Sequence, residues 1–271
     1  MDLYDGIMER RSIRKYSEKT FTKEHILELE ESLNHLNSLY PVKDFRVVFV
    51  NQRENHAPTR LGFLFGAVKI NAPHCLVAIC EKNRQAMLNV GFAVEELVIR
   101  LTCLGCGTCW LGTFNRDYLN NFCKVKENET IAAVIAAGYG EYSFMNKGFR
   151  SISGTNKRKP VDQVFYYKAY PQKADSCPSA AKSLMKVMEM SIKAPSANNR
   201  QPVKVIFDEL SAHFFTEKDA CLDAGIFISH FYLCAAEENL RPQYVFDNSP
   251  KSDFKIPGTY SYAGTITYQL S

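Results

Sequence analysis

Two long apolar segments constrain the fold of this chain more than any other feature. Residues 86–104 and 219–239 both have the length and composition of helices that are apolar on most sides. The first carries Leu88, Val90, Phe92, Val94, Leu97, Val98 and Leu101, and the second carries Phe227, Ile228, Phe231 and Cys234. A helix of this kind is buried rather than laid on a surface. We therefore expect two long helices at the centre of the molecule.

Around these helices, the elements of the chain repeat in order. The first half offers a short helix over 3–11, a helix capped by Thr22, strands over 45–50 and 75–80, the long helix, and strands over 108–111 and 130–137. The second half offers a helix over 181–192, a strand over 203–207, the long helix, and strands over 241–246 and 262–270. This repeat predicts an α+β fold in which two similar halves pack around the two buried helices.

The halves are expected at residues 1–145 and 179–271, with a crossover connection at 146–178. The stretch from 141 to 176 is punctuated by Gly148, Gly154, Pro160 and Pro171, and is rich in Lys, Arg and Tyr. It predicts little regular structure. Its length suggests that it wraps the body or lines a site.

Composition narrows the function classes. The 271 residues are 46% hydrophobic and 23% charged, with a net charge of +4 and no dominant Lys/Arg block, so a nucleic-acid partner is not expected. No apolar run is long enough to span a bilayer, and the first five residues lack the apolar core of a signal peptide. We expect a cytoplasmic protein whose 9 Cys are reduced.

A basic run stands near the start of the chain: Arg10-Arg11-Ser12-Ile13-Arg14. Guanidinium groups bind phosphate through paired, charge-assisted hydrogen bonds, and Ser adds a short donor. Arg10 and Arg14 would face one ligand if the preceding helix continued through them. Taken alone, the run is more typical of a solvated basic patch at a helix end, because short basic clusters are common.

A polar turn stands deep in the second half, at residues 194–202. Pro195 and Pro202 limit its backbone, and Ser196, Asn198, Asn199 and Gln201 crowd donors and acceptors between them. Such a rigid turn can present backbone and amide groups to a polar heterocycle, although helix-to-strand turns favour these residues in any case.

Together the two runs resemble signatures of the flavin mononucleotide (FMN)-dependent nitroreductase family. Two further segments resemble the same family: 104–114, which looks like the glycine loop after the central helix, and Lys157-Arg158-Lys159-Pro160, which looks like the basic pair that closes on the FMN phosphate. In the family the first two signatures lie close together, and the site forms where two subunits meet. Here one chain carries both far apart, which resembles the fused, single-chain branch, a pseudo-dimer.

The resemblance implies a role for each matching residue. Arg10, Ser12 and Arg158 would hold the phosphate, with Lys157 a weaker contributor and Arg11 beside them. Arg14 would lie near the pyrimidine end of the flavin, where a cation raises the potential of the ring. The backbone of Leu111 and Gly112 would approach the ring nitrogen that accepts hydride. Pro195, Ser196, Ala197, Asn199 and Gln201 would cover the ring from the other half.

The gaps in the resemblance are complementary. In the first half, residues 37–42 stand where the polar turn would be, and the second half has no basic run and no glycine loop. We therefore expect one flavin site per chain and a monomer, because the usual reason for dimerising is met within the chain.

The resemblance implies an oxidoreductase that moves hydride from NAD(P)H through FMN to a nitroaromatic, quinone or similar small acceptor in a ping-pong scheme. No protein side chain is then required as a catalytic acid or base. Two alternatives stay open: a flavin enzyme with a narrow substrate, and an FMN-binding carrier or sensor without turnover. Cys103, Cys106 and Cys109 are spaced like part of an iron–sulfur run but lack its fourth ligand, so no metal is expected.

Overall fold

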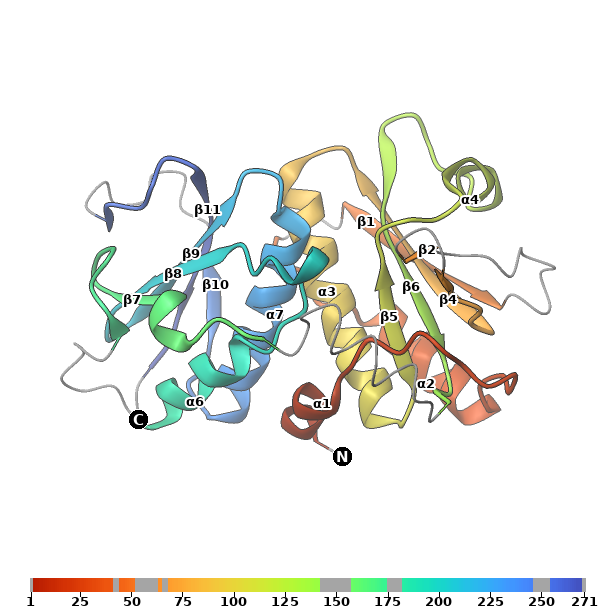
Figure 1. Cartoon of the computed structure of the whole chain (residues 1–271), viewed down its shortest axis with the longest axis horizontal. Helices are drawn as coiled ribbons and strands as arrows, with labels where there is room; N and C mark the ends of the chain where they lie inside the picture. Colours follow the sequence, from red (N-terminus) through yellow and green to blue (C-terminus); the bar gives the residue numbers. More distant parts are fainter. Residues whose placement is uncertain are drawn as a thin grey trace.

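The structure is a computed structural model that describes residues 2–40, 44–51, 63–64, 68–141, 157–174, 182–245 and 254–269 (Figure 1). Its helices are α1 (Leu3–Glu9), α2 (Lys23–Asn34), α3 (Arg84–Cys103), α4 (Arg116–Phe122), α6 (Lys182–Ser191) and α7 (Cys221–Glu237), with the short 3₁₀ helices η1 (Val161–Gln163) and η3 (Ala197–Asn199). Its strands are β1 (Phe45–Asn51), β2 (Phe63–Leu64), β3 (Val68–Lys69), β4 (His74–Glu81), β5 (Gly107–Leu111), β6 (Glu129–Gly138), β7 (Phe165–Tyr167), β8 (Val203–Phe207), β9 (Ser211–Glu217), β10 (Gln243–Val245) and β11 (Tyr260–Thr267).

Two sheets of matching topology stand on either side of the long helices (Figure 1). The first has the order β1-β4-β6-β5, and the second has the order β8-β9-β11-β10 with β7 added beside β8. The shared strands pair antiparallel in both sheets, whereas β7 runs parallel to β8. The predicted α+β fold of two similar halves is thus confirmed.

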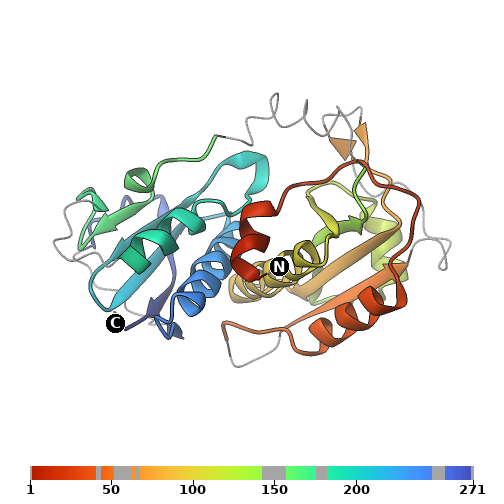
Figure 2. The same ribbon diagram turned by 90° about the horizontal axis from the view of Figure 1, so that it is seen from below.

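Helices α3 and α7 cross at a reciprocal pair of glycines. A Cβ on Gly91 would lie 2.2 Å from the carbonyl oxygen of Leu222, and a Cβ on Gly225 would lie 2.1 Å from that of Leu88. Each glycine therefore meets the residue three positions before the other, as a local twofold axis requires. Only hydrogen fits between backbones this close. Figure 2 shows α1 lying against both helices near this seam.

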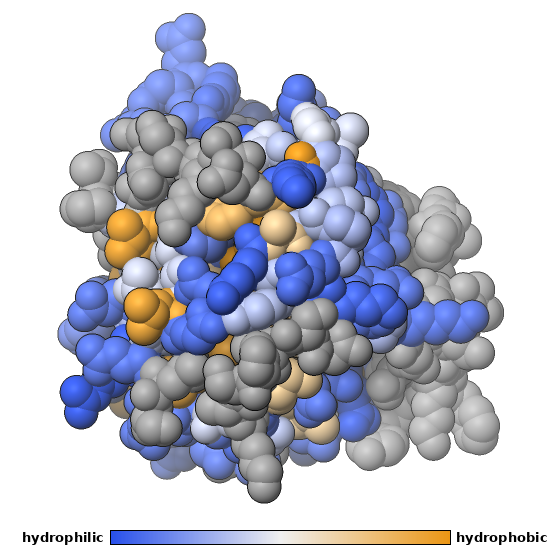
Figure 3. All heavy atoms as spheres, turned by 90° about the vertical axis from the view of Figure 1, so that its left-hand side faces the viewer, coloured by the Kyte–Doolittle hydropathy of each residue, from blue (hydrophilic) through white to orange (hydrophobic). Residues whose placement is uncertain are grey.

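The two long helices are buried as their sequences predicted. Val90, Val94 and Val98 of α3 have no exposed surface, and neither have Ile228 and Phe231 of α7. The side of the second half that faces away from the first is mostly hydrophilic, with apolar residues scattered across it (Figure 3). Within the described residues, no helix is both long and apolar enough to cross a membrane.

Local expectations were confirmed where a segment is long or fully apolar. Thr22 caps α2 by accepting from the backbone N–H of His25, and β1, β4, β6 and β8 lie at their expected positions. The expectation of little regular structure over 141–176 is wrong for η1 and β7, although 142–156 and 175–176 lie outside the described residues. Three aromatic residues make β7, and so short a strand has no periodicity of its own; pairing with β8 decides it.

Candidate functional site

The basic run leaves α1 and lies along the glycine segment. Arg10 caps the end of α1, so the helix does not continue through the run and the expected helical spacing of Arg10 and Arg14 is wrong. Instead Ser12 bridges Thr108 in parallel, and the N–H of Ile13 donates to the carbonyl of Thr108 at 2.8 Å. The tight approach needs Gly107, since a Cβ there would lie 2.9 Å from Ile13. Two segments that the sequence analysis assigned to one site are therefore neighbours.

Arg10 is buried beside a carboxylate on the central helix. Its side chain is 7% exposed, and its Nε lies 3.6 Å from Oε1 of Glu95, which is fully buried. Among the described residues, that Nε has no hydrogen-bond partner. Glu95 accepts instead from Trp110 Nε1 at 2.8 Å and contacts Nε2 of the buried His230 at 2.9 Å. Arg10 thus keeps donor capacity for a ligand.

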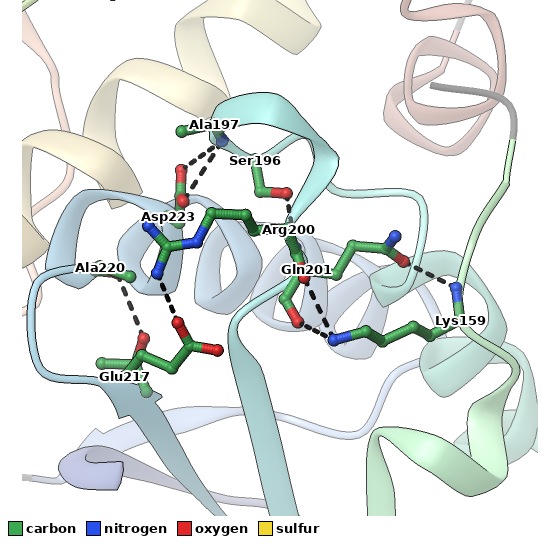
Figure 4. Close-up of polar contacts among 9 residues, drawn as sticks. Lys159, Ser196, Ala197, Arg200, Gln201, Glu217, Ala220 and Asp223 are labelled. Atoms are coloured by element: carbon green, nitrogen blue, oxygen red, sulfur yellow. Dashed lines mark hydrogen bonds and ion pairs between the residues drawn. The ribbon is translucent and has the colours of Figure 1, made fainter. Parts of the chain in front are cut away.

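The polar turn is held in a strained shape by its own side chains and by α7. Asn198, Asn199 and Gln201 all have positive φ, at 52°, 55° and 51°. Such backbone costs energy in residues other than glycine and persists only where neighbours impose it. Here Ser196 Oγ accepts from the N–H of Gln201 at 2.9 Å, and the carboxylate of Asp223 accepts from the N–H of Ala197 at 3.1 Å (Figure 4).

The basic segment at 157–159 is fastened to this turn. Arg158 donates to Asn199 Oδ1 at 2.6 Å and to the carbonyl of Lys193 at 2.9 Å. Asn199 returns a hydrogen bond to the carbonyl of Lys157 at 2.9 Å, and Gln201 accepts from the N–H of Lys159 at 2.7 Å. The amides of Asn199 and Gln201 therefore serve first to hold Arg158 at the turn (Figure 4 shows the Gln201–Lys159 contact).

The charges of Arg10 and Glu95 both act on Arg158, which indicates that the basic run and the segment at 157–159 lie near each other. Burial and, to a lesser extent, the charge of Arg10 lower the pKa of Arg158 to about 10, while the charge of Glu95 acts in the opposite direction. At neutral pH both guanidiniums remain charged. Two like charges that are poorly solvated repel each other, and an anion bound between them would relieve this repulsion.

The other predicted residues occupy varied positions. Arg14 contacts the carbonyl of Ser12 at 3.4 Å, and its charge acts on the buried thiol of Cys109, whose pKa is raised by burial. Leu111 is buried, while Gly112 is exposed with open space where a Cβ would stand. Two basic residues point outward: Lys157 is exposed, and Arg11 pairs with Glu9 at 3.0 Å. Pro195 lies half-buried at the start of the turn.

Sequence reasoning missed Glu95, His230 and Asp223. Each is a polar residue in a helix that is otherwise apolar on most sides, and all three are buried. A buried charge demands a partner, so their placement was the available signal.

In the first half, the position equivalent to that of the polar turn is occupied by another segment of the chain. By the glycine crossing, Asn89 corresponds to Asp223, and Asn89 Oδ1 accepts from the N–H groups of Leu39 and Tyr40 at 2.9 and 3.3 Å. The segment from residue 37 to 40 therefore stands where the polar turn stands, as expected; residues 41 and 42 lie outside the described ranges. The hydroxyls of Tyr40 and Tyr244 lie 3.2 Å apart there.

Comparison with known proteins agrees with this architecture. The family model described as "Putative TM nitroreductase" matches residues 2–235. A curated protein of Archaeoglobus fulgidus, described as "Putative NADH dehydrogenase/NAD(P)H nitroreductase", is 25% identical over 143 residues, which is 49% of this chain and 82% of the relative. A crystal structure described as a putative nitroreductase of Thermotoga maritima covers 100% of this chain and 94% of its own, with a TM-score of 0.66 and 22% identity.

The match to the family model covers both the basic run and the polar turn, and the solved structure shares the fold over the full length of the chain. The chain therefore belongs to the nitroreductase family, in the branch described as "Putative TM nitroreductase", and is an oxidoreductase.

Proposed function

We propose that the chain is an FMN-dependent oxidoreductase that takes hydride from NAD(P)H and passes it to a nitroaromatic, quinone or similar small acceptor. The observation that carries the proposal is a pair of guanidiniums: the buried Arg10 of the first half, and the half-buried Arg158 of the crossover connection, which is hydrogen-bonded to the polar turn of the second half. Bound FMN would supply the redox chemistry, since no described side chain is arranged to exchange hydride.

The residues present fit a monophosphate. Within the described ranges, the buried Nε of Arg10 has no hydrogen-bond partner, and Arg158 is held by two hydrogen bonds, so neither needs to reorganise when an anion arrives. Ser12, whose backbone bridges Thr108, would add a hydroxyl donor. Arg11 and Lys157, being exposed, would contribute mainly long-range attraction.

The remaining predicted contacts are proposed for the ring. Pro195, Ser196 and Ala197 belong to a turn whose shape is imposed by Asp223, so they form a rigid wall rather than an adaptable loop. Open space at Gly112 leaves the adjoining backbone accessible to a planar ligand. Arg14 would favour a negatively charged reduced ring.

Two separate substrates use one ring face in this scheme. The name of the Archaeoglobus relative supports a nicotinamide nucleotide as the donor. The acceptor would follow at the same place after the donor leaves, which makes the reaction ping-pong. We propose that the chain acts as a monomer, because both contributors to the site belong to one chain.

The test is a visible spectrum of the purified protein, with the released flavin quantified after denaturation. We expect bound FMN, and bleaching of its absorbance on anaerobic addition of NADH or NADPH. Bound FMN that neither nucleotide reduces would favour the carrier or sensor. Failure to bind FMN, even after incubation with it, would refute the proposal.

A further inference from the structure

Glu95 is the buried carboxylate that the proposed function leaves without a role. It lies on α3 with no exposed surface, at the seam between the halves and beside the phosphate site. A charged carboxylate is costly to bury and is retained only where something compensates it. The groups around it show what that compensation is.

The hydrogen bonds of Glu95 go to groups that are not part of the phosphate site. Oε2 accepts from the indole N–H of Trp110 at 2.8 Å, and Oε1 contacts Nε2 of His230 at 2.9 Å. Among the described residues, Nδ1 of His230 has no hydrogen-bond partner, so this imidazole is held by its contact with Glu95. Trp110 comes from β5 and His230 from α7, so the carboxylate is fixed from both halves.

Arg10 is related to Glu95 by charge rather than by a hydrogen bond. Its Nε lies 3.6 Å from Oε1, beyond normal hydrogen-bond length, and has no hydrogen bond within the described structure. At this separation in a buried place the Coulomb attraction is still strong. The charge of Glu95 also acts on Arg158: it raises the pKa of Arg158, whereas the charge of Arg10 lowers it.

We propose that Glu95 is the internal counter-ion of the phosphate site: it stabilises the buried charge of Arg10 in the ligand-free protein and weakens the binding of an incoming phosphate. The inference rests on the phosphate site of the proposed function, but not on the flavin ring. A counter-ion differs in this from a positioning residue, which would orient Arg10 and strengthen the binding of phosphate.

The two roles predict opposite effects of Glu95→Gln. The amide keeps the size of the side chain and an acceptor for Trp110 while removing the charge. We expect the ligand-free protein to melt at a lower temperature, because a buried cation has lost its partner. We also expect the ratio of FMN affinity to riboflavin affinity to rise about tenfold, since riboflavin lacks the phosphate and reports any change at the ring.

Glu96→Gln is the matched control. Glu96 is the next residue of α3 and also buried, but it bonds to Arg100 and Asn37, away from Arg10. The affinity ratio should be unchanged in this variant. An unchanged or lower ratio in Glu95→Gln would overturn the counter-ion role.

A second experiment adds inorganic phosphate alone. We expect phosphate to raise the melting temperature of Glu95→Gln by more than it raises that of wild type. Wild type that responds to phosphate but does not bind FMN would refute the proposed function, and this arm alone would then decide the inference. A chain that responds to neither ligand would overturn both.

A double-mutant cycle covers the case in which Glu95→Gln folds poorly. Arg10→Met alone leaves the carboxylate buried without its cation, so its melting temperature should fall further than that of the double variant Arg10→Met/Glu95→Gln. A double variant no more stable than Arg10→Met would show that the two charges are not coupled, and the proposal would fail.

Discussion

At the scale of single residues, burial separates the cations of this chain by role. The side chain of Arg10 is buried and Arg158 is half-buried, whereas Arg11 and Lys157, their immediate neighbours in sequence, are exposed to water. A charge–charge contact in water is screened and contributes little, while the same contact at a buried place is strong. The proposed phosphate site should therefore depend on two of these four cations.

Arg158→Met is expected to weaken FMN binding about 10- to 100-fold, through loss of a charge-assisted hydrogen bond of roughly 1.5–3 kcal/mol. Lys157→Met, one residue away, should change it by no more than about threefold. Quenching of flavin fluorescence on titration measures both. Equal losses in the two variants would show that overall charge, and not the guanidinium of Arg158, binds the ligand.

Asp223 gives the residue-scale prediction for pH. Burial raises the pKa of this carboxyl, against the lowering effects of the Ala197 N–H and Arg200. A carboxyl with a higher pKa in the folded chain ionises at a cost to folding, and the cost is full above the folded pKa and absent below the unfolded one. Asp223→Asn should therefore be more stable than wild type at neutral pH, with an advantage that shrinks on acidification.

Urea unfolding of both proteins from neutral to acidic pH measures this difference. The counterpart is Asn89→Asp at the equivalent place of the first half, where Asn89 already donates to Asp44 at 3.0 Å. That change should destabilise the chain at neutral pH by placing two carboxylates together. An Asp223→Asn advantage that grows as the pH falls would contradict the argument.

At the scale of elements, the crossing of α3 and α7 positions the site. Gly91 and Gly225 allow the helices to touch backbone to backbone, and this contact sets where Glu95 and Asp223 project. The turn, the basic run and the carboxylate thus take their places from one helix pair. Because the packing there admits no side chain, the crossing has little freedom to shift.

Gly91→Ala should destabilise the fold by about 1–3 kcal/mol, because the added methyl meets the carbonyl of Leu222. The intrinsic helix preference for Ala, about 1 kcal/mol, acts in the opposite direction and is outweighed. Gly258→Ala is the control: nothing lies within 4 Å of its Cβ position, and the change should stay within about 0.5 kcal/mol. Chemical denaturation midpoints compare the two. A neutral Gly91→Ala would mean that the helices can separate without cost.

At the scale of the whole molecule, the proposed site belongs to neither half alone. Arg10 comes from the first half, the polar turn from the second, and Arg158 from the segment between them, while at the equivalent place Tyr40 of the first half contacts Tyr244 of the second. A ligand bound at such a site contacts both halves only when they are packed together. Its binding should therefore stabilise the chain as one unit.

We expect one FMN per chain of 30.8 kDa, a monomer in solution, and a single thermal transition that FMN shifts upward. At 100 times the dissociation constant the stabilisation should be about 2.7 kcal/mol. Calorimetry with and without FMN, together with light scattering on the eluting peak, checks all three. Two transitions of which FMN moves only one, or two flavins per chain, would contradict a shared single site.

The sequence by itself determined the buried helices, the repeat, and the positions of the basic run and the polar turn. Helical and strand periodicities are local, and a helix that is apolar on most sides, such as residues 86–104, is expected to be buried. The complementary gaps were also readable, since the segment at residues 37–40 plainly lacked the polar turn. Among the elements that the sequence did not predict are β9 (Ser211–Glu217) and β7, which is too short to show a period and forms only because β8 is beside it.

Only the tertiary structure decided how the runs become a site. The sequence did not predict that α1 ends at Arg10 or that Glu95 lies beside Arg10. Nor did it predict that the amides of Asn199 and Gln201 form hydrogen bonds to residues 157–159. Each of these contacts joins segments far apart in the chain. The energies of these contacts depend on distance and burial, which follow from the crossing of α3 and α7. No local sequence pattern predicts them.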